Sequence, residues 1–208
     1  MRDQYNQQLE KLHDSLEIMG ALCVHFIGLA ATGDPAKAEE ILCRGHEVDE
    51  MERDIERLCL RLLLRQQPVA SDLRQVSAAL KMVTDLERIG DQAEDIASIV
   101  VSAGHAIPEI SSMGASASAM VHDSVRAFVK EDLELARSVA VRDDLVDSAF
   151  ERIKHQLMER IMVGNLGDED PLDVLMAAKY FERIGDHAVN VSEWVVFGLT
   201  GMHPKMAV

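Results

Sequence analysis

Hydrophobic residues recur every three or four positions along almost the whole chain, which is the spacing of one face of an α-helix. One such stripe consists of Leu73, Val76, Leu80 and Val83. No segment alternates hydrophobic and polar residues in the manner of a half-buried strand. The pattern therefore predicts an all-α protein, which glycine, proline and capping residues divide into six helices.

The boundaries of these helices follow from residues that start or end helices. Asp34 with Pro35 supplies an N-cap and a first helical residue, and Asp170 with Pro171 does the same. The first expected helix ends at Gly33. The other five run from Asp34 to Gln67, from Ser71 to about Ala103, from about Ser112 to Lys130, from Asp132 to the turn Gly164–Gly167, and from Asp170 to Gly198–Gly201.

The second half of the chain repeats the first. The pentapeptide E-R-I-G-D occurs at Glu87–Asp91 and again, 95 residues later, at Glu182–Asp186. In the preceding helix the matching residues lie 98 apart, as in Val48-Asp49 and Val146-Asp147, because the second turn is three residues shorter. This register indicates a duplicated three-helix bundle. We expect two tandem, pseudo-symmetric three-helix bundles, residues 1–106 and 107–208, with the boundary at Gly104–Pro108.

The charge and the cysteines narrow the class of protein. The chain has 36 acidic residues against 21 Lys and Arg, a net charge of −15 that would repel nucleic acid and that favours metal cations or basic protein surfaces as partners. Three widely spaced cysteines are typical of reduced thiols in the cytoplasm. The N-terminus has no signal-peptide pattern. The apolar run Ile18–Ala31 is interrupted by His25 and is shorter than the roughly 20 residues of a membrane span. We therefore expect a soluble cytoplasmic protein.

Acidic residues replace hydrophobic ones along the third and sixth helices. The stripe of the third helix continues into Glu87, Asp91 and Glu94, with Asp95 at its edge. Burial of unpaired carboxylates is costly, so the pattern indicates that another group compensates them. The sixth helix carries Glu182 and Asp186, and the preceding helices carry the acids expected to face these pairs: Asp49, with His46 and Glu52 nearby, in the first half, and Asp143 and Asp147 in the second.

Oxygen ligands of this kind suit Mg, Ca, Mn or iron better than a metal that prefers thiolates, and several carboxylates could hold more than one ion. We expect divalent or iron ions (Mg, Mn, Fe or Zn) at these faces. The alternative is a salt-bridge network with Arg53, Arg88 and Arg183. Gly90 and Gly185, inside the motifs, are better explained by close helix packing.

No catalytic constellation accompanies the acids. The sequence has no nucleotide-binding glycine loop, serine-hydrolase elbow or zinc-hydrolase spacing, so we expect no enzyme. A carboxylate-bridged di-iron bundle would need paired Glu-x-x-His motifs, whereas Glu10–His13 is the single match and is remote from E-R-I-G-D. His187 follows Asp186, but its counterpart is Gln92, which argues against a shared ligand role.

At these residues the sequence resembles the PhoU family of bacterial phosphate-signalling proteins. The resemblance covers about Leu9 to Leu199. It rests on the two E-R-I-G-D copies, on Val48-Asp49 with Val146-Asp147, and on the first inter-helix turn, Arg65-Gln66-Gln67-Pro68 with Ser71-Asp72-Leu73-Arg74. It implies two three-helix bundles and two metal-binding faces with acids at Glu87 and Asp91, Glu182 and Asp186, and Asp143 and Asp147. The chain departs from this pattern where Gly45 replaces one acid beside Asp49, so His46, Glu52 or Asp95 would supply the missing ligand, or the first site is weaker.

The resemblance also implies a function. It implies a cytoplasmic regulator of phosphate uptake that represses phosphate-starvation signalling through contacts with a sensor histidine kinase and the ATPase of a Pst-type phosphate transporter. Such a protein would be peripheral to membrane complexes without insertion, and could be a homodimer. The alternatives are a carboxylate-bridged metal protein or a pure scaffold outside phosphate signalling.

Overall fold

The computed structural model describes residues 2–65, 70–104, 107–164 and 170–202. In this part of the chain all regular structure is helical. The helices are α1 (Arg2–Ala30), α2 (Pro35–Arg44), α3 (His46–Arg65), α4 (Ala70–Ala103), a short 3₁₀-helix η1 (Pro108–Ile110), α5 (Ser111–Val129), α6 (Leu133–Met162) and α7 (Pro171–Thr200).

The all-α prediction is confirmed, with one change in the second helix. That helix is interrupted at Gly45 and becomes α2 and α3, whereas its counterpart α6 is continuous. Gly45 keeps helical dihedral angles, so the chain does not form an open turn where the helix is interrupted. In addition, α4 begins at Ala70, so Ser71 lies inside the first turn and does not precede it. The predicted turns at residues 67–69 and 165–167 lie outside the described residues.

Three predicted N-caps start helices as expected. The Asp34 carboxylate accepts a hydrogen bond from the Ala36 amide at 3.0 Å, and Asp170 starts α7 in the same way. Asp132 accepts from the Leu135 amide at 2.9 Å. These side chains satisfy amide groups that have no partner within the helix. Short polar segments therefore define the beginnings of α2, α6 and α7.

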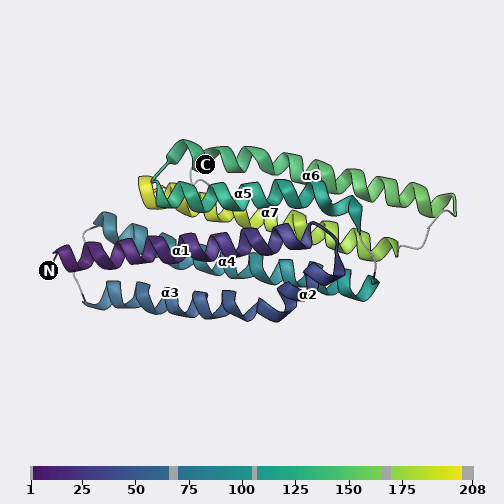
Figure 1. The fold of residues 1–208 in the computed structure, drawn as a ribbon. Helices are drawn as coiled ribbons and strands as arrows, with labels where there is room; N and C mark the ends of the chain where they lie inside the picture. Colours follow the sequence, from purple (N-terminus) through teal and green to yellow (C-terminus); the bar gives the residue numbers. More distant parts are fainter. Residues whose placement is uncertain (1, 66–69, 105–106, 165–169, 203–208) are drawn as a thin grey trace.

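The two sets of helices lie side by side (Figure 1). The set α1, α3 and α4 packs together, α5, α6 and α7 pack together, and the most extensive contact between any two helices is between α4 and α7. The buried hydrophobic residues of both sets form one continuous cluster. Because α4 and α7 join the halves through this shared core, the division of the chain at residue 106 stays a prediction.

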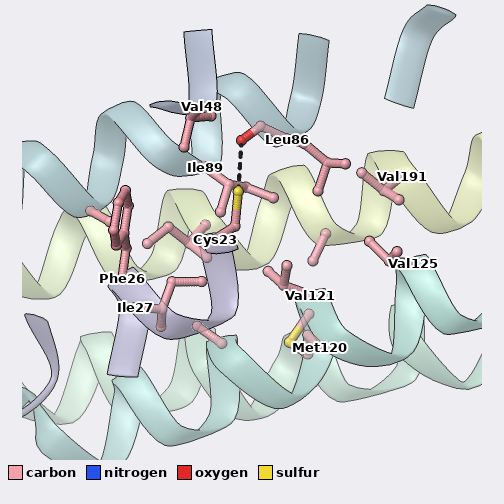
Figure 2. Close-up of a cluster of buried hydrophobic side chains, with 14 of the residues drawn as sticks. Cys23, Phe26, Ile27, Val48, Leu86, Ile89, Met120, Val121, Val125 and Val191 are labelled. Carbon is pink, nitrogen blue, oxygen red and sulfur yellow. Dashed lines mark hydrogen bonds between the residues drawn. The ribbon is translucent and has the colours of Figure 1, made fainter. Parts of the chain in front are cut away.

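Side chains of α1 contribute to the centre of this cluster (Figure 2). Phe26 and Ile27 have no exposed surface, and the Cys23 thiol donates a hydrogen bond to the Leu86 carbonyl of α4 at 3.4 Å. Burial raises the pKa of Cys23 to about 12, so this thiol is an unreactive core group. All three cysteines, Cys23, Cys43 and Cys59, are free.

The segment Tyr5–Ala30 of α1 is long and apolar enough to cross a membrane. The sequence-based argument that the apolar run is too short for a membrane span, made for Ile18–Ala31, is therefore wrong for α1 as a whole. Burial and charge argue against one. The apolar face of α1 packs into the core, where Leu12 has no exposed surface, and the opposite face exposes Glu10 and Lys11 together with further acids of the same helix. Lipid would leave those charges unsolvated. α1 is therefore a core helix of the bundle.

Candidate metal centre

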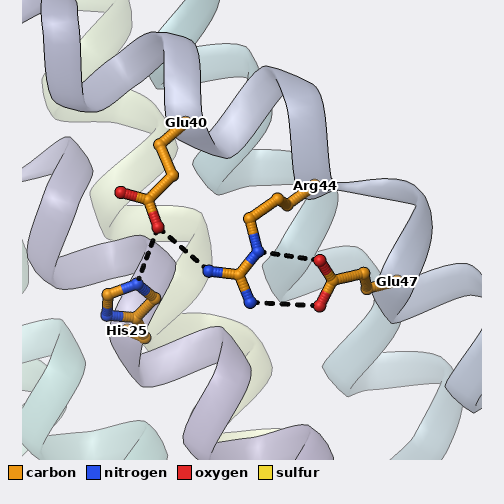
Figure 3. A network of polar contacts seen from close by, with 4 residues as sticks. All are labelled: His25, Glu40, Arg44 and Glu47. Atoms are coloured by element: carbon orange, nitrogen blue, oxygen red, sulfur yellow. Dashed lines mark hydrogen bonds and ion pairs between the residues drawn. The ribbon is translucent and has the colours of Figure 1, made fainter.

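The junction between α2 and α3 is held by a polar network (Figure 3). The Arg44 guanidinium at the end of α2 donates to both Glu47 oxygens in α3, at 2.7 and 3.1 Å, and to Glu40 at 2.9 Å. Glu40 also contacts His25 of α1 at 3.3 Å. These contacts connect the last turn of α2 to the first turn of α3 across Gly45. The first turn of α3 carries Val48 and Asp49, which both face α4.

We call Asp49, Glu87 and Asp91 the first acidic face. One carboxylate oxygen of each residue lies within 4.8 Å of those of the other two. Glu87 and Asp91 are four residues apart on α4, so they lie on the same side of that helix, and Asp49 reaches them from α3. The helices approach closely because Gly90 has no side chain: a Cβ there would lie 2.9 Å from Cγ1 of Val48. The packing interpretation of Gly90 accounts for this geometry.

The first acidic face is electrostatically unbalanced. Burial, followed by the charge of Asp91, raises the pKa of Glu87 to about 7. Asp91 keeps an exposed surface, and its pKa is also raised, by partial desolvation against α3 and by Asp49 and Asp95. The expected arginine partners compensate little of this: Arg53 contacts Asp49 at 3.4 Å in a solvent-exposed pair, and an exposed pair of this kind contributes little energy. The face therefore has the charge and oxygen chemistry that a hard cation would balance.

The second acidic face consists of Asp143, Asp147, Glu182 and Asp186. Burial, and then the charges of the other three, raises the pKa of Asp143 to about 6. Its buried Oδ1 atom has no hydrogen-bond partner among the described residues, and it lies 3.0 Å from the position that a Cβ of Gly185 would take. The pKa values of Asp147 and Asp186 are raised by burial and by Glu182.

The two faces differ in the position of a cation. In the second face the Lys179 ammonium contacts the Glu182 carboxylate and lies 5.3 Å from the centre of the Phe150 ring. The corresponding residue of the first half is Thr84, which is uncharged. In the part of the chain that the structure describes, the first acidic face is the one place where three carboxylates meet within 4.8 Å.

Glu94 is the acidic residue that the sequence-based choice of site residues missed. Its carboxylate occupies the space beside Gly45, where a side chain at position 45 would begin. Burial, followed by the charges of Asp91 and Asp49, raises its pKa. Of the residues expected to replace the missing acid, His46 and Asp95 are exposed. The available signal was helical spacing, because Glu94 lies on the stripe that contains Glu87.

A polar contact between the halves was also missed. Asp85 of α4 is buried, and its Oδ1 atom lies 2.9 Å from Nδ1 of His187 and 3.4 Å from the Asn190 amide nitrogen, both on α7. His187 thus binds an acid of the other half. The contact depends on how α4 and α7 pack, which the sequence does not reveal.

The repeated acidic faces on paired three-helix sets correspond to a family model described as the PhoU domain, which matches residues 9–100 and 110–195. The chain belongs to the PhoU family. A PhoU homolog of Clostridium acetobutylicum, described as a phosphate-specific transport system accessory protein, is 36% identical over 207 residues, which is 95% of this chain and 94% of that protein. The accessory protein PhoU of Escherichia coli K12 is 31% identical, covering 95% of this chain and 86% of its own.

Solved structures agree with the fold. The crystal structure of PhoU from Pseudomonas aeruginosa matches with a TM-score of 0.87 at 32% identity, covering 95% of this chain and all of that one. PhoU from Streptococcus pneumoniae, described as a phosphate transport system regulatory protein, matches with a TM-score of 0.84 at 26% identity, covering 96% and 98% of the two chains. These names describe accessory and regulatory proteins, which fits a protein without catalytic function.

Proposed function

We propose that this protein is a cytoplasmic accessory regulator of a phosphate-specific transport system, and that it represses phosphate-starvation signalling when phosphate is plentiful. The observation that carries the proposal is the pair of acidic faces, repeated in both halves of a PhoU-family chain. The names of the relatives support the transport connection. The protein would act by docking to partners and would catalyse no reaction.

The second part of the proposal is that the acidic faces bind metal ions. The residues fit a divalent or iron ion because their donors are all carboxylate oxygens, a donor set suited to Mg, Mn or Fe and available to Zn. Asp49, Glu87 and Asp91 would hold an ion in the first half, and Asp143, Asp147, Glu182 and Asp186 in the second. The metal would supply positive charge that offsets the repulsion among these acids. The raised pKa of Glu87 and the unpartnered Oδ1 of Asp143 support this view.

The third part concerns partners. Following the family resemblance, we propose a sensor histidine kinase and the ATPase of a Pst-type transporter as partners, with the protein peripheral to the membrane complex and acting as a homodimer. The net charge of −15 supports a basic docking surface on the partner and disfavours nucleic acid. A pull-down from phosphate-replete cells should recover the kinase or the ATPase, and its recovery should decrease when salt screens the charges.

Gene deletion tests the regulatory role. Loss of the protein should derepress phosphate uptake and alkaline phosphatase in phosphate-rich medium. Wild-type protein and a variant with the exposed α1 residue Glu17→Gln should both restore repression, whereas Glu182→Gln with Asp186→Asn should restore only part of it. A deletion strain with unchanged phosphate-regulated expression would reject this role and favour a scaffold or a regulator of another transporter.

Metal titration tests the metal-binding role separately. Isothermal titration of chelator-treated protein with Mn²⁺ should detect binding, and Glu182→Gln with Asp186→Asn should abolish one class of site and leave the other. Affinity should decrease at lower pH because carboxylates must lose their protons to bind. Absence of any binding by the wild-type protein would mean that the faces are purely structural.

A further inference from the structure

The two halves differ at two positions that lie next to the acids. In the helices that precede the motifs, Gly45 corresponds to Asp143. In the helices that carry the motifs, Glu94 corresponds to Val189. Each half therefore has one acid at these two positions. In the first half the acid is on the helix that carries the motif, and in the second half it is on the preceding helix. Over the five pairs of positions 45/143, 49/147, 87/182, 91/186 and 94/189, each half has four acids: Asp49, Glu87, Asp91 and Glu94 in the first, and Asp143, Asp147, Glu182 and Asp186 in the second.

The structure gives a physical reason for this exchange. The carboxylate of Glu94 fills the space in which a Cβ of residue 45 would lie. A side chain at position 45 would therefore displace the Glu94 carboxylate from its present place. In the second half Asp143 and Val189 line the same depression in the surface, together with Asp186. Positions 94 and 189 therefore both border the acids of their own half.

We propose that Glu94 supplies the fourth carboxylate of the first metal site, in place of the acid that is absent at Gly45. This inference rests on the proposed metal-binding function and identifies one residue of that site. It assigns three carboxylates of the first site to α4 and one, Asp49, to α3. The second site takes two from α6 and two from α7. The first site is then as rich in carboxylates as the second, which disfavours the alternative of a weaker first site.

The test uses the full chain with the second site disabled by Glu182→Gln and Asp186→Asn, so that Mn²⁺ titration reports the first site. In this background Glu94→Gln should weaken Mn²⁺ binding by about tenfold or more, because metal affinity depends on the number of charged ligands. The matched control is Glu50→Gln, which makes the same change at an exposed residue next to Asp49. It should change the affinity by less than about threefold, since an exposed charge is screened by solvent.

Exchange of the two positions provides a rescue. Gly45→Asp combined with Glu94→Val gives the first half the residues of the second half, and should recover most of the lost affinity. Gly45→Asp alone should lower the melting temperature of the metal-free protein, because it adds a fifth carboxylate to this face and displaces that of Glu94, whereas the double variant should melt close to wild type.

The possible failures are distinguishable. If the parent with the second site disabled binds no Mn²⁺, the metal function proposed for the first face is overturned together with the role of Glu94. If that parent binds Mn²⁺ and Glu94→Gln binds as tightly, the role of Glu94 alone is overturned. Equal weakening by Glu94→Gln and Glu50→Gln would also overturn it, because general charge would then explain both effects.

Discussion

Metal-free protein should lose stability as the pH rises, and Glu87 should cause much of the loss. The surroundings of Glu87 raise its pKa from 4.5 to about 7, whereas a glutamate in an unfolded chain titrates near ~4.3. Between these values the folded state binds more protons than the unfolded state, so the free energy of unfolding decreases with increasing pH. Below this window both states are protonated. Above it both are ionised and the full loss is present.

The size of the effect follows from the pKa displacement. Fully realised, a pKa raised from 4.5 to about 7 corresponds to about 3 kcal/mol of unfolding free energy. Solvent screens a large part of it, because Glu87 is half-buried and Asp91 is exposed, and we therefore expect about 1–2 kcal/mol. Glu87→Gln keeps the shape of the side chain and removes its charge. The variant should exceed wild type in stability by this amount near about pH 8 and match it near about pH 4.5.

Urea denaturation of chelator-treated protein, followed by far-ultraviolet circular dichroism at several pH values, measures this effect. The control Glu17→Gln carries the same change on the exposed side of α1 and should follow the wild-type pH dependence. Addition of Mn²⁺ should stabilise wild type at the higher pH and stabilise Glu87→Gln less. A wild-type unfolding free energy that stays constant or rises between these pH values would refute the reasoning, since the acids would then already be compensated.

Three further changes probe the fold, each measured by thermal or urea denaturation. Gly114→Ala should destabilise by about 1–3 kcal/mol, because a Cβ there would collide with neighbouring core side chains, whereas Gly28→Ala, with nothing within 4 Å, should be neutral or stabilise by up to ~1 kcal/mol. Asp132→Ala should cost about 1 kcal/mol through loss of the α6 N-cap. Asp85→Ala should cost about 1–3 kcal/mol by leaving the half-buried His187 without its acceptor. If Gly114→Ala, Asp132→Ala or Asp85→Ala is as stable as wild type, the contact assigned to that residue is wrong.

The sequence predicts the helices well because their boundaries are set by local chemistry. Asp34, Asp132 and Asp170 act as N-caps through contacts with residues only two or three positions away. The interruption at Gly45 could not be predicted in the same way. Gly45 has ordinary helical dihedral angles. The space beside it is filled by Glu94, which comes from a distant part of the chain, so the interruption does not follow from the residues around Gly45.

In the candidate site, too, local spacing predicts some features, and others depend on how the helices pack. Helical spacing predicts that Glu87 and Asp91 lie together, and the duplication predicts that Asp49 faces them; the structure brings all three within 4.8 Å. Whether they bind metal stays a prediction. The contact of Asp85 with His187 joins residues 102 apart and does not follow from periodicity, because it requires the helices to be docked. Periodicity places Glu94 on the same stripe as Glu87, but the position of its carboxylate beside Gly45 depends on how the α2–α3 junction packs against α4.

The repulsion among the carboxylates is offset by different residues in the two halves. In the second face a lysine on the same helix, Lys179, neutralises part of the charge by contacting Glu182. In the first face the corresponding position is Thr84, and the nearest ion pair, between Arg53 and Asp49, is exposed and 3.4 Å long. Bound metal would therefore offset more repulsion in the first half than in the second. The repeats share a motif, but we expect their dependence on a cation to be unequal, so each face has to be measured alone.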